Sequence, residues 1–271
     1  MKLISIGDNV ADTYVKQRSY FPGGNCVNVA VDAKKAGAEV SAYLGILGDD
    51  DRAQHIEKSL QAEKVDLVNC RKAYAPTAQP RVLLTTAGDR TFKAGPKNSA
   101  LHLLSLRLTP DDFKKIATFD VSHLSIDSGI EAYLPELHRL VKVSFDFSDL
   151  RDDDYFKRVL PNVDYAFFSG AALEDEQAVE FAKKYLTLGP EVVVITRGEQ
   201  PALVLTSQTA CYQDPQKVEV IDTMGAGDSF IAGFLVSYFD HKNLVQAAQA
   251  ASKNAAATCQ IQGGFGHPKS F

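Results

Sequence analysis

Short hydrophobic runs alternate with amphipathic stretches along most of the chain. The run at residues 3–7 predicts a short buried strand, and the stretch at 25–38 predicts a helix that Gly37 ends. The alternation continues in a strand at 39–48 and a helix at 49–65, which begins in aspartates that favour a helix N-terminus. Further strands are predicted at residues 119–126, 141–148, 163–170 and 190–198, each next to helical sequence.

The run PEVVVIT at residues 190–196 is almost continuously β-branched. Such a run is typical of a parallel strand that is covered on both faces. With the alternation of strands and helices, it predicts an α/β fold made of βαβ units around a doubly wound, mostly parallel sheet.

Two segments do not follow this pattern. Residues 10–21 alternate apolar and polar positions and carry aromatics, and residues from 71 to about 95 predict a hairpin that turns at Ala87-Gly88-Asp89. We interpret them as a small antiparallel flap that projects from the core; the alternative is two ordinary long loops. A flap beside a ligand cleft would exclude water from it.

Composition narrows the classes of function. The chain has 271 residues, enough for a large core in one domain or in one domain with an appendage. Its formal charge of −5, without a long run of like charges, argues against binding to nucleic acid or to a membrane surface. No apolar run is long enough to span a membrane, and no signal peptide is expected because a strand pattern starts at Lys2. Four cysteines without metal-ligand spacing suggest reduced thiols and a cytoplasmic protein.

The stretch VIDTMGAGDSFIAGF at residues 220–234 is the strongest candidate for chemistry. It predicts a Val-Ile strand, a glycine turn and an apolar helix, so the backbone N–H groups of Gly225, Ala226 and Gly227 would form an anion site at the helix N-terminus. Asp228 either caps this helix or acts as a general base. Capping explains the aspartate but not the small residues around it, whereas a base beside a transferring phosphoryl group explains both.

A second glycine turn, FPGGNCVN, spans residues 21–28. Asn25 and Asn28 are three residues apart and share one face of the predicted helix start, where amides beside flexible glycines suit a polyhydroxyl ligand. The alternative for Asn25 is a simple helix cap. Asn28 lies inside the helix, where asparagine is a poor choice on propensity alone.

Two common nucleotide-binding motifs are excluded. The chain has no GxxxxGK[ST], so it is not a P-loop enzyme. GAGDSF lacks the third glycine of a dinucleotide fingerprint and lies near the C-terminus, which makes a nicotinamide dehydrogenase a poor interpretation.

These motifs resemble those of a known family. DTMGAGDSFIAGF is similar to the C-terminal signature of the ribokinase-like (PfkB) carbohydrate kinases, DTxGAGDxFxxGF. GGNCVNVA resembles the N-terminal signature of the family, and TRGEQPALV resembles its TxGxxG strand-turn. The resemblance covers essentially the whole chain. It implies one ribokinase-like domain over residues 1–271, with a three-layer α/β/α core and a β-sheet lid formed from about 10–21 and 71–95.

The resemblance also implies roles for residues at the sugar end. Asp228 is similar to the catalytic base of the family, which deprotonates the sugar hydroxyl that attacks the γ-phosphate of ATP. Gly225, Ala226 and Gly227 resemble its anion hole. Asp12, Gly24 and Asn28 match its sugar contacts.

On the nucleotide side, Thr196 and Gly198 match positions of the ATP site, and Asn254 lies on the helix that flanks the adenine in this family. ATP with Mg²⁺ is therefore expected as the cofactor. The segment SGAALEDE departs from the NxxE motif that organises the magnesium-water network, because Ser169 and Ala172 replace its Asn and Glu. Glu174 or Glu176 would have to substitute.

Two further departures concern the same region. The common DxNxR pattern reads DFSDLR, with Asp146 retained, Ser148 in place of Asn, and Arg151 one position late. Pro201 replaces the last glycine of TxGxxG. The catalytic base and the anion hole are intact.

Within the family, the chain most resembles the fructoselysine 6-kinases, which share the Ser-for-Asn changes. A fructosamine such as fructoselysine, phosphorylated at its 6-hydroxyl, is the substrate that this resemblance implies. Asp8 and Asp12 would help to accommodate its amine cation. Arg90, at the turn of the flap, either covers the site or is simply solvated.

Two alternatives stay open. One is a kinase of another sugar, such as fructose or ribose, or of a nucleoside. The other is a sugar or nucleotide sensor that has lost catalysis, which the altered NxxE motif suggests and the intact Asp228 opposes. The protein is expected to be a monomer or a homodimer formed through the lid, and Tyr14, Tyr20 and Phe92 of the flap would suit either state.

Overall fold

The computed structural model describes residues 1–84, 90–93 and 95–271, and for Leu84 and residues 90–92 it describes the backbone alone. Within these ranges, ten strands form one large sheet with the order β14-β13-β12-β11-β10-β9-β1-β4-β5, and β6 pairs with the end of β4. From β5 to β12 the neighbours are parallel, and β13 and β14 are added antiparallel. The strands are β1 (Lys2–Gly7), β4 (Val40–Leu47), β5 (Asp66–Leu67), β6 (Arg71–Lys72), β9 (Val121–Ser125), β10 (Lys142–Asp146), β11 (Tyr165–Ser169), β12 (Val192–Arg197), β13 (Gln200–Leu205) and β14 (Ala210–Gln213).

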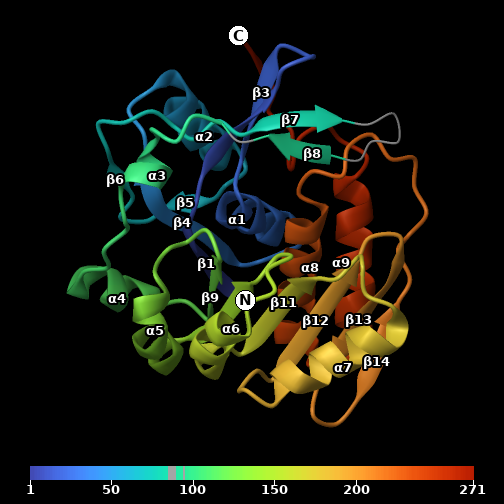
Figure 1. The fold of residues 1–271 in the computed structure, drawn as a ribbon. Helices are drawn as coiled ribbons and strands as arrows, with labels where there is room; N and C mark the ends of the chain where they lie inside the picture. The colour runs from blue at the N-terminus through green and yellow to red at the C-terminus, as the bar shows by residue number, and fades with distance from the viewer. Residues whose placement is uncertain (85–89, 94) are drawn as a thin grey trace.

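Helices cover both faces of this sheet (Figure 1). Two separate groups of buried side chains form between the sheet and the helices, one on each face. One face carries α1 (Asn25–Lys35), α8 (Ala226–His241) and α9 (Leu244–Thr258), with α2 (Asp51–Ala62) packed beside α1. The other carries α4 (Pro110–Ile116), α5 (Leu134–Leu140), α6 (Asp153–Val159) and α7 (Asp175–Leu186). The short helices α3 (Ala100–Leu103), η1 (Glu131–Tyr133) and η2 (Leu160–Asn162) lie in connections. The predicted α/β/α layering is confirmed.

A second, smaller sheet lies at one edge of the molecule (Figure 1). Its strand order is β15-β3-β2-β7-β8, from β15 (Lys269–Ser270), β3 (Ser19–Gly23), β2 (Val10–Tyr14), β7 (Arg81–Leu84) and β8 (Arg90–Lys93). Its pairings are antiparallel except that of β2 with β7. Since β2 follows β1 after two residues, the small sheet begins where the first strand of the core ends.

The structure corrects two details of the sequence interpretation. Arg71 and Lys72 do not belong to the small sheet, because they pair with Ile46 and Leu47 of β4. The hairpin therefore consists of β7 and β8; the turn predicted at residues 87–89 lies outside the described residues. The strand β15 was not predicted, because a two-residue strand carries no periodic signal.

The strand predicted at Val220–Ile221 is also wrong. The backbone N–H groups of Ile221 and Asp222 both donate to the carbonyl oxygen of Cys259, at 2.8 and 3.2 Å. Cys259 follows the last residue of α9, so this segment satisfies a helix end and not a sheet edge. Ile221 is exposed as a consequence.

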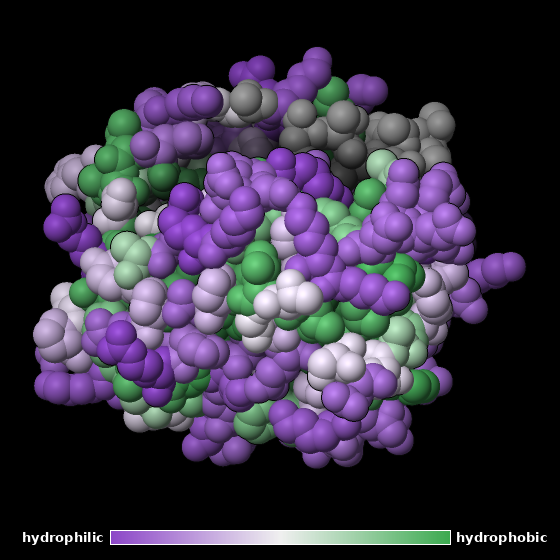
Figure 2. Space-filling model, turned by 60° about the horizontal axis from the view of Figure 1, so that its bottom comes forward, coloured by the Kyte–Doolittle hydropathy of each residue, from purple (hydrophilic) through white to green (hydrophobic). Residues whose placement is uncertain are grey.

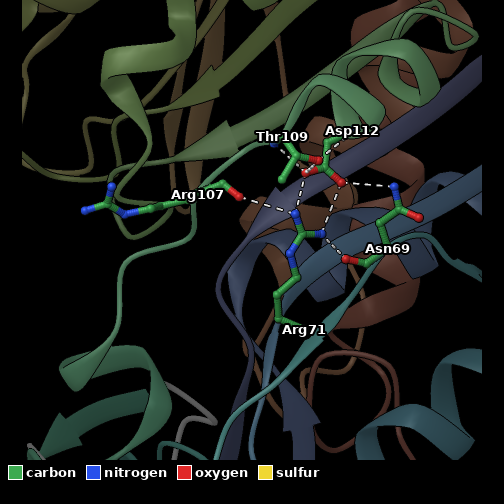
Figure 3. A network of polar contacts seen from close by, with 5 residues as sticks. All are labelled: Asn69, Arg71, Arg107, Thr109 and Asp112. Carbon is green, nitrogen blue, oxygen red and sulfur yellow. Dashed lines mark hydrogen bonds and ion pairs between the residues drawn. The ribbon is translucent and has the colours of Figure 1, made fainter.

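A polar network ties β6 to the start of α4 (Figure 3). The carboxylate of Asp112 is buried and accepts hydrogen bonds from the Arg71 guanidinium, from Asn69 Nδ2 at 3.0 Å and from the backbone N–H and hydroxyl of Thr109 at 2.7 and 2.8 Å. Burial alone would raise the pKa of Asp112, but the hydrogen bonds from Arg71, Thr109 and Asn69 outweigh it and hold this pKa well below its ordinary value.

The surface that Figure 2 shows is mainly hydrophilic, and its hydrophobic residues form small separate groups. No helix within the described ranges combines the length and the apolar character needed to cross a membrane.

Candidate active site

Asp228 lies in the first turn of α8, and a glycine makes this helix start possible. Gly225 precedes the helix in a left-handed conformation, with φ of 74°. A Cβ atom at this position would lie 2.7 Å from Cα of Gly264, so a larger residue would collide with backbone. Asp228 therefore occupies a fixed place at the positive end of α8.

The two other small residues of the predicted anion hole, Ala226 and Gly227, are the first two residues of α8. Gly227 is exposed, and a Cβ atom there would meet no atom within 4 Å. The N–H of Ala226 donates to the carbonyl oxygen of Thr223 at 3.2 Å, a long bond within the turn. The N-terminus of α8 thus leaves space for an anion, which the positive end of the helix dipole would stabilise.

Asp222 fixes the loop before α8. It is fully buried, and its carboxylate accepts hydrogen bonds from the backbone N–H groups of Met224 and Gly263, each at 2.9 Å, and from the Tyr14 hydroxyl of β2. Met224 packs with Tyr14, Phe21 and Val82 of the small sheet. The small sheet and the loop that carries the anion site are therefore in direct contact.

Two amides from α1 hold the carboxylate of Asp228. Asn25 Nδ2 donates to Asp228 Oδ1 at 2.8 Å and also to Asp146 Oδ2 at 2.8 Å. Asn28 Nδ2 donates to Asp228 Oδ2 at 2.7 Å. Asn25 is therefore not a helix cap: α1 has Gly24 at its N-cap position and no capping side chain. The side-chain amide of Asn25 instead donates to Asp228, which is 203 positions away in the sequence.

A buried chain of polar groups orients Asn25 in turn. His123 Nε2 lies 2.9 Å from Asn25 Oδ1, and His123 Nδ1 lies 2.9 Å from the Ser144 hydroxyl. Burial lowers the pKa of His123 to about 3, so the ring is neutral. Because both Asn25 N–H groups point to carboxylates, its Oδ1 must accept, which assigns the proton to Nε2. The sequence analysis missed His123, since a lone histidine in a buried strand carries no distinctive pattern.

The other residues predicted at the sugar end gather around Gly23 and Gly24. Asp12 on β2 is buried, and its Oδ2 occupies the space that a side chain at Gly23 would need. Oδ2 of Asp8 lies 2.7 Å from the place of a Cβ atom at Gly24. Asn28 Oδ1 is buried and accepts no hydrogen bond from the described residues. Arg90 is the first residue of β8, and its side chain lies outside the described residues.

Two carboxyl groups near Asp228, those of Asp146 and Asp8, have raised pKa values. Burial, and then the charge of Asp228, raise the pKa of Asp146 to about 7. Burial, and then the charge of Asp127, raise the pKa of Asp8 to about 6. At mildly acidic pH, Asp146 and Asp8 therefore keep protons that an aspartate in water would release.

These raised pKa values give stability a pH dependence of known sign. Between about pH 4 and 7 the folded state binds a proton on Asp146 that the unfolded state has released, so the free energy of unfolding falls as the pH rises through this window. Asp146→Asn should remove the contribution of Asp146 to this pH dependence. We expect the drop in melting temperature from roughly pH 5 to roughly pH 8 to be smaller in the variant than in the wild-type protein.

The matched control is Asp154→Asn, which changes a carboxylate that is 91% exposed. It should keep the wild-type pH dependence of melting. A drop of the same size in Asp146→Asn and in wild type would contradict the prediction.

The residues predicted on the nucleotide side lie at the end of β12 and on α9. Thr196 lies at the end of β12, and Gly198 follows with φ of 63° in the turn to β13. Asn254 lies on α9, where its side chain abuts Gly233 of α8. Pro201 lies on β13.

The predicted metal-site residues are not gathered into a binding site. Glu174 is exposed and forms a capping box with Gln177 at the start of α7, and Glu176 is exposed in the first turn of that helix. Among the residues that the structure describes, no three His, Cys, Asp or Glu side chains are grouped as metal ligands. Arg151, one position after the place of the arginine in the family pattern, donates to the carbonyl oxygen of Ser169 at the end of β11, at 2.6 Å.

Comparison with known proteins gives a consistent result. The family model described as pfkB family carbohydrate kinase matches residues 1–267. Fructosamine kinase FrlD of Bacillus subtilis is 42% identical over 267 residues, which are 98% of this chain and 94% of that protein. Fructoselysine 6-kinase of Escherichia coli is 35% identical over 264 residues, which are 97% and 99% of the two chains.

Solved structures agree on the fold. Arabidopsis thaliana ribokinase, complexed with ribose and ATP, has a TM-score of 0.82 at 19% identity and covers 97% of this chain, with 93% of its own chain covered. A putative ribokinase II from E. coli, in complex with ATP and Mg²⁺, has a TM-score of 0.80 at 18% identity, with 97% and 94% covered. At these identities the likeness shows the fold alone.

Proposed function

Since the chain belongs to the pfkB family of carbohydrate kinases, we propose that it transfers the γ-phosphate of ATP to the 6-hydroxyl of a fructosamine such as fructoselysine. As a member of this family it is a phosphotransferase that acts on a sugar hydroxyl. The names of the two similar relatives, fructosamine kinase and fructoselysine 6-kinase, support the choice of substrate.

The observation that carries the mechanism is the carboxylate of Asp228 at the start of α8, held by Asn25 and Asn28. Asp228 accepts the proton of the 6-hydroxyl while the hydroxyl oxygen forms its bond to the γ-phosphorus. The bond from that phosphorus to the bridging oxygen breaks, and ADP leaves. Hydrogen bonds from two amides and the dipole of α8 keep Asp228 ionised for this step.

The loop Gly225-Ala226-Gly227 would bind the transferring phosphoryl group. Its N–H groups lie at the positive end of a helix, and its small side chains allow close approach. Charge that develops on the phosphoryl oxygens is thereby stabilised where it forms. Thr196, Gly198 and Asn254 are the residues that we assign to the rest of the nucleotide.

The sugar would lie between Asp228 and the glycines of the β3–α1 turn. Asp12 and Asn28 offer buried oxygen acceptors for its hydroxyls, and Gly24 allows Asp8 to lie close to the backbone of this turn. The small sheet would act as a lid over this position, which would exclude water from the reacting groups. Arg90 stays a candidate for covering the substrate, with a solvated arginine as the alternative.

Magnesium fits this arrangement as a partner of the nucleotide and not of a protein cage. Mg²⁺ binds nucleotide phosphates with few protein ligands, and it neutralises their charge. Glu174 is engaged in capping α7, so Glu176 is the better of the two candidates to order the water around the ion.

A substrate panel tests the proposal. ADP release is measured with Mg-ATP and fructoselysine, other fructosamines, fructose, ribose or adenosine. We expect kcat/KM for fructoselysine to exceed that for fructose by a factor of about 10 or more, because a hydrogen bond to a charged group contributes ~1.5–3 kcal/mol. Phosphorus NMR of the product should place the phosphate on C6. Preference for a plain sugar would support the kinase activity but contradict the proposed substrate. Binding of ATP and sugar without turnover would indicate a sensor.

A further inference from the structure

A cavity of about 220 Å³ lies beside the proposed sugar position. Its walls come from the β1–β2 junction with Gly7 and Asn9, from residues 100–106, and from residues 127–129. Asp8, which lies against Gly24, accepts a hydrogen bond from the Ser125 hydroxyl at 3.4 Å, two positions before Asp127. The cavity is therefore next to the sugar site and is lined by different side chains.

Asn9 presents a fixed acceptor to this cavity. The residue is only 5% exposed, and its Nδ2 donates to the Tyr43 hydroxyl at 2.9 Å and to the carbonyl oxygen of Ile46 at 2.8 Å. These two bonds use both amide hydrogens and set the orientation of the amide. Asn9 Oδ1 accepts no hydrogen bond from any side chain or backbone group that the structure describes.

Asp127 presents a second acceptor. Its side chain is exposed where it lines the cavity, and within the described ranges its carboxylate makes no hydrogen bond or ion pair. His102 lines the same cavity and is the basic side chain that acts on Asp127; its Nδ1 lies 2.6 Å from the Ser99 hydroxyl. The Asp127 carboxylate can therefore accept hydrogen bonds from a ligand in the cavity.

Part of the cavity wall is apolar. Leu103 and Leu104 belong to its lining and remain 62% and 47% exposed, although large apolar side chains usually avoid solvent. Ile46 and Leu106 line it as well. The cavity is thus lined by two oxygen acceptors, Asn9 Oδ1 and the Asp127 carboxylate, and by leucine side chains that offer a surface for a hydrocarbon chain.

We propose that this cavity binds the amine part of the fructosamine, with Asp127 and Asn9 Oδ1 accepting the two N–H hydrogens of its protonated secondary amine. The two N–H donors of the amine are thus matched by two acceptors, the charged carboxylate of Asp127 and the neutral oxygen of Asn9. In a fructosamine this nitrogen is on C1, at the opposite end of the sugar chain from the 6-hydroxyl at Asp228. The carbon chain of the amine then lies along Leu103 and Leu104. The inference rests on the proposed function and assigns its specificity to residues outside the family motifs.

Asp8, which the sequence suggested for the amine, is less suited to this role. It is 4% exposed, and its Oδ1 already accepts from the Cys26 N–H at 3.2 Å as well as from Ser125. Burial raises the pKa of Asp8 to about 6 and also raises the pKa of Asp127, so the choice between them rests on the hydrogen bonds that already occupy Asp8.

A matched pair of substrates tests the inference. 1-Deoxy-1-(butylamino)fructose carries the cation, and 1-O-butylfructose has the same length without it. In the wild-type enzyme, kcat/KM for the amine should exceed that for the ether. Asp127→Asn should lower kcat/KM for the amine by about 10- to 100-fold, mostly through KM, and leave the ether unchanged.

Controls separate this inference from the proposed function. Asp111→Asn removes an exposed carboxylate on α4 and should behave as wild type. Leu104→Ser should weaken the butylamine substrate more than the methylamine homologue. An unchanged amine-to-ether ratio in Asp127→Asn would overturn the inference while fructosamine turnover upheld the function. Failure of the wild type to phosphorylate any fructosamine would overturn both.

Discussion

Asp228→Asn should lower kcat by roughly 10²- to 10⁴-fold, the contribution of a positioned general base. The variant keeps one oxygen that can accept from Asn25 or Asn28, so the start of α8 should stay folded. It loses the ability to take the proton of the attacking hydroxyl. Steady-state ADP release with a saturating fructosamine measures the effect, and ATP affinity measured by calorimetry should change little.

Asp240→Asn, near the other end of α8, is the matched control. Its carboxylate is 45% exposed and pairs with the N-terminal amine at 3.5 Å. It should retain wild-type kcat. If Asp228→Asn kept more than about a tenth of wild-type kcat, Asp228 would not be the base.

Asp112→Asn should lower the free energy of unfolding by about 3 kcal/mol, because it leaves the Arg71 guanidinium without its buried partner. The variant also loses part of the capping box at Thr109 (Figure 3). Urea unfolding at neutral pH measures the loss. Activity per folded molecule should remain unchanged, since this network joins β6 to α4 and has no member in the active site.

The pH dependence of this loss has a definite sign. The folded pKa of Asp112 is depressed, so the stabilisation is fully present above about pH 4 and is lost as the pH falls further. The difference between wild type and Asp112→Asn should therefore shrink in acid. Asp111→Asn, beside it but 82% exposed, should change the free energy of unfolding by no more than about 0.5 kcal/mol. A constant difference from neutral pH to about pH 3 would contradict the assignment.

The fold could be predicted from sequence because its signal is local. The β-branched run at 190–196 and the helix at 25–38 carry their periodicity within a few residues, and both form as predicted. Val220–Ile221 has the same local appearance as a strand, yet it binds the carbonyl oxygen of Cys259 instead. No pattern within residues 220–234 contains that partner.

The site was predicted only as far as its motifs reach. Asp228 and Asn28 were named from motifs, and they lie 2.7 Å apart in the structure. Asn25 was named with them, but its link to His123 and Ser144 depends on which strands are neighbours in the sheet. Asn9 and Asp127 meet across a cavity for the same reason. Contacts that arise from the order of strands in the sheet join residues far apart in the chain. Such contacts leave no local sequence pattern from which they could be predicted.

The hydrogen bonds between α1 and Asp228 also bear on how the protein is made. They join residues that are 203 and 200 positions apart, so the ribosome releases Asn25 and Asn28 long before residue 228 exists. A nascent chain can form β1, α1 and β4 while it still lacks the carboxylate that completes the site. Partly synthesised chains therefore cannot consume ATP by the proposed route. Recovery of catalysis after dilution from denaturant would report the last long-range docking step, not the early formation of helices.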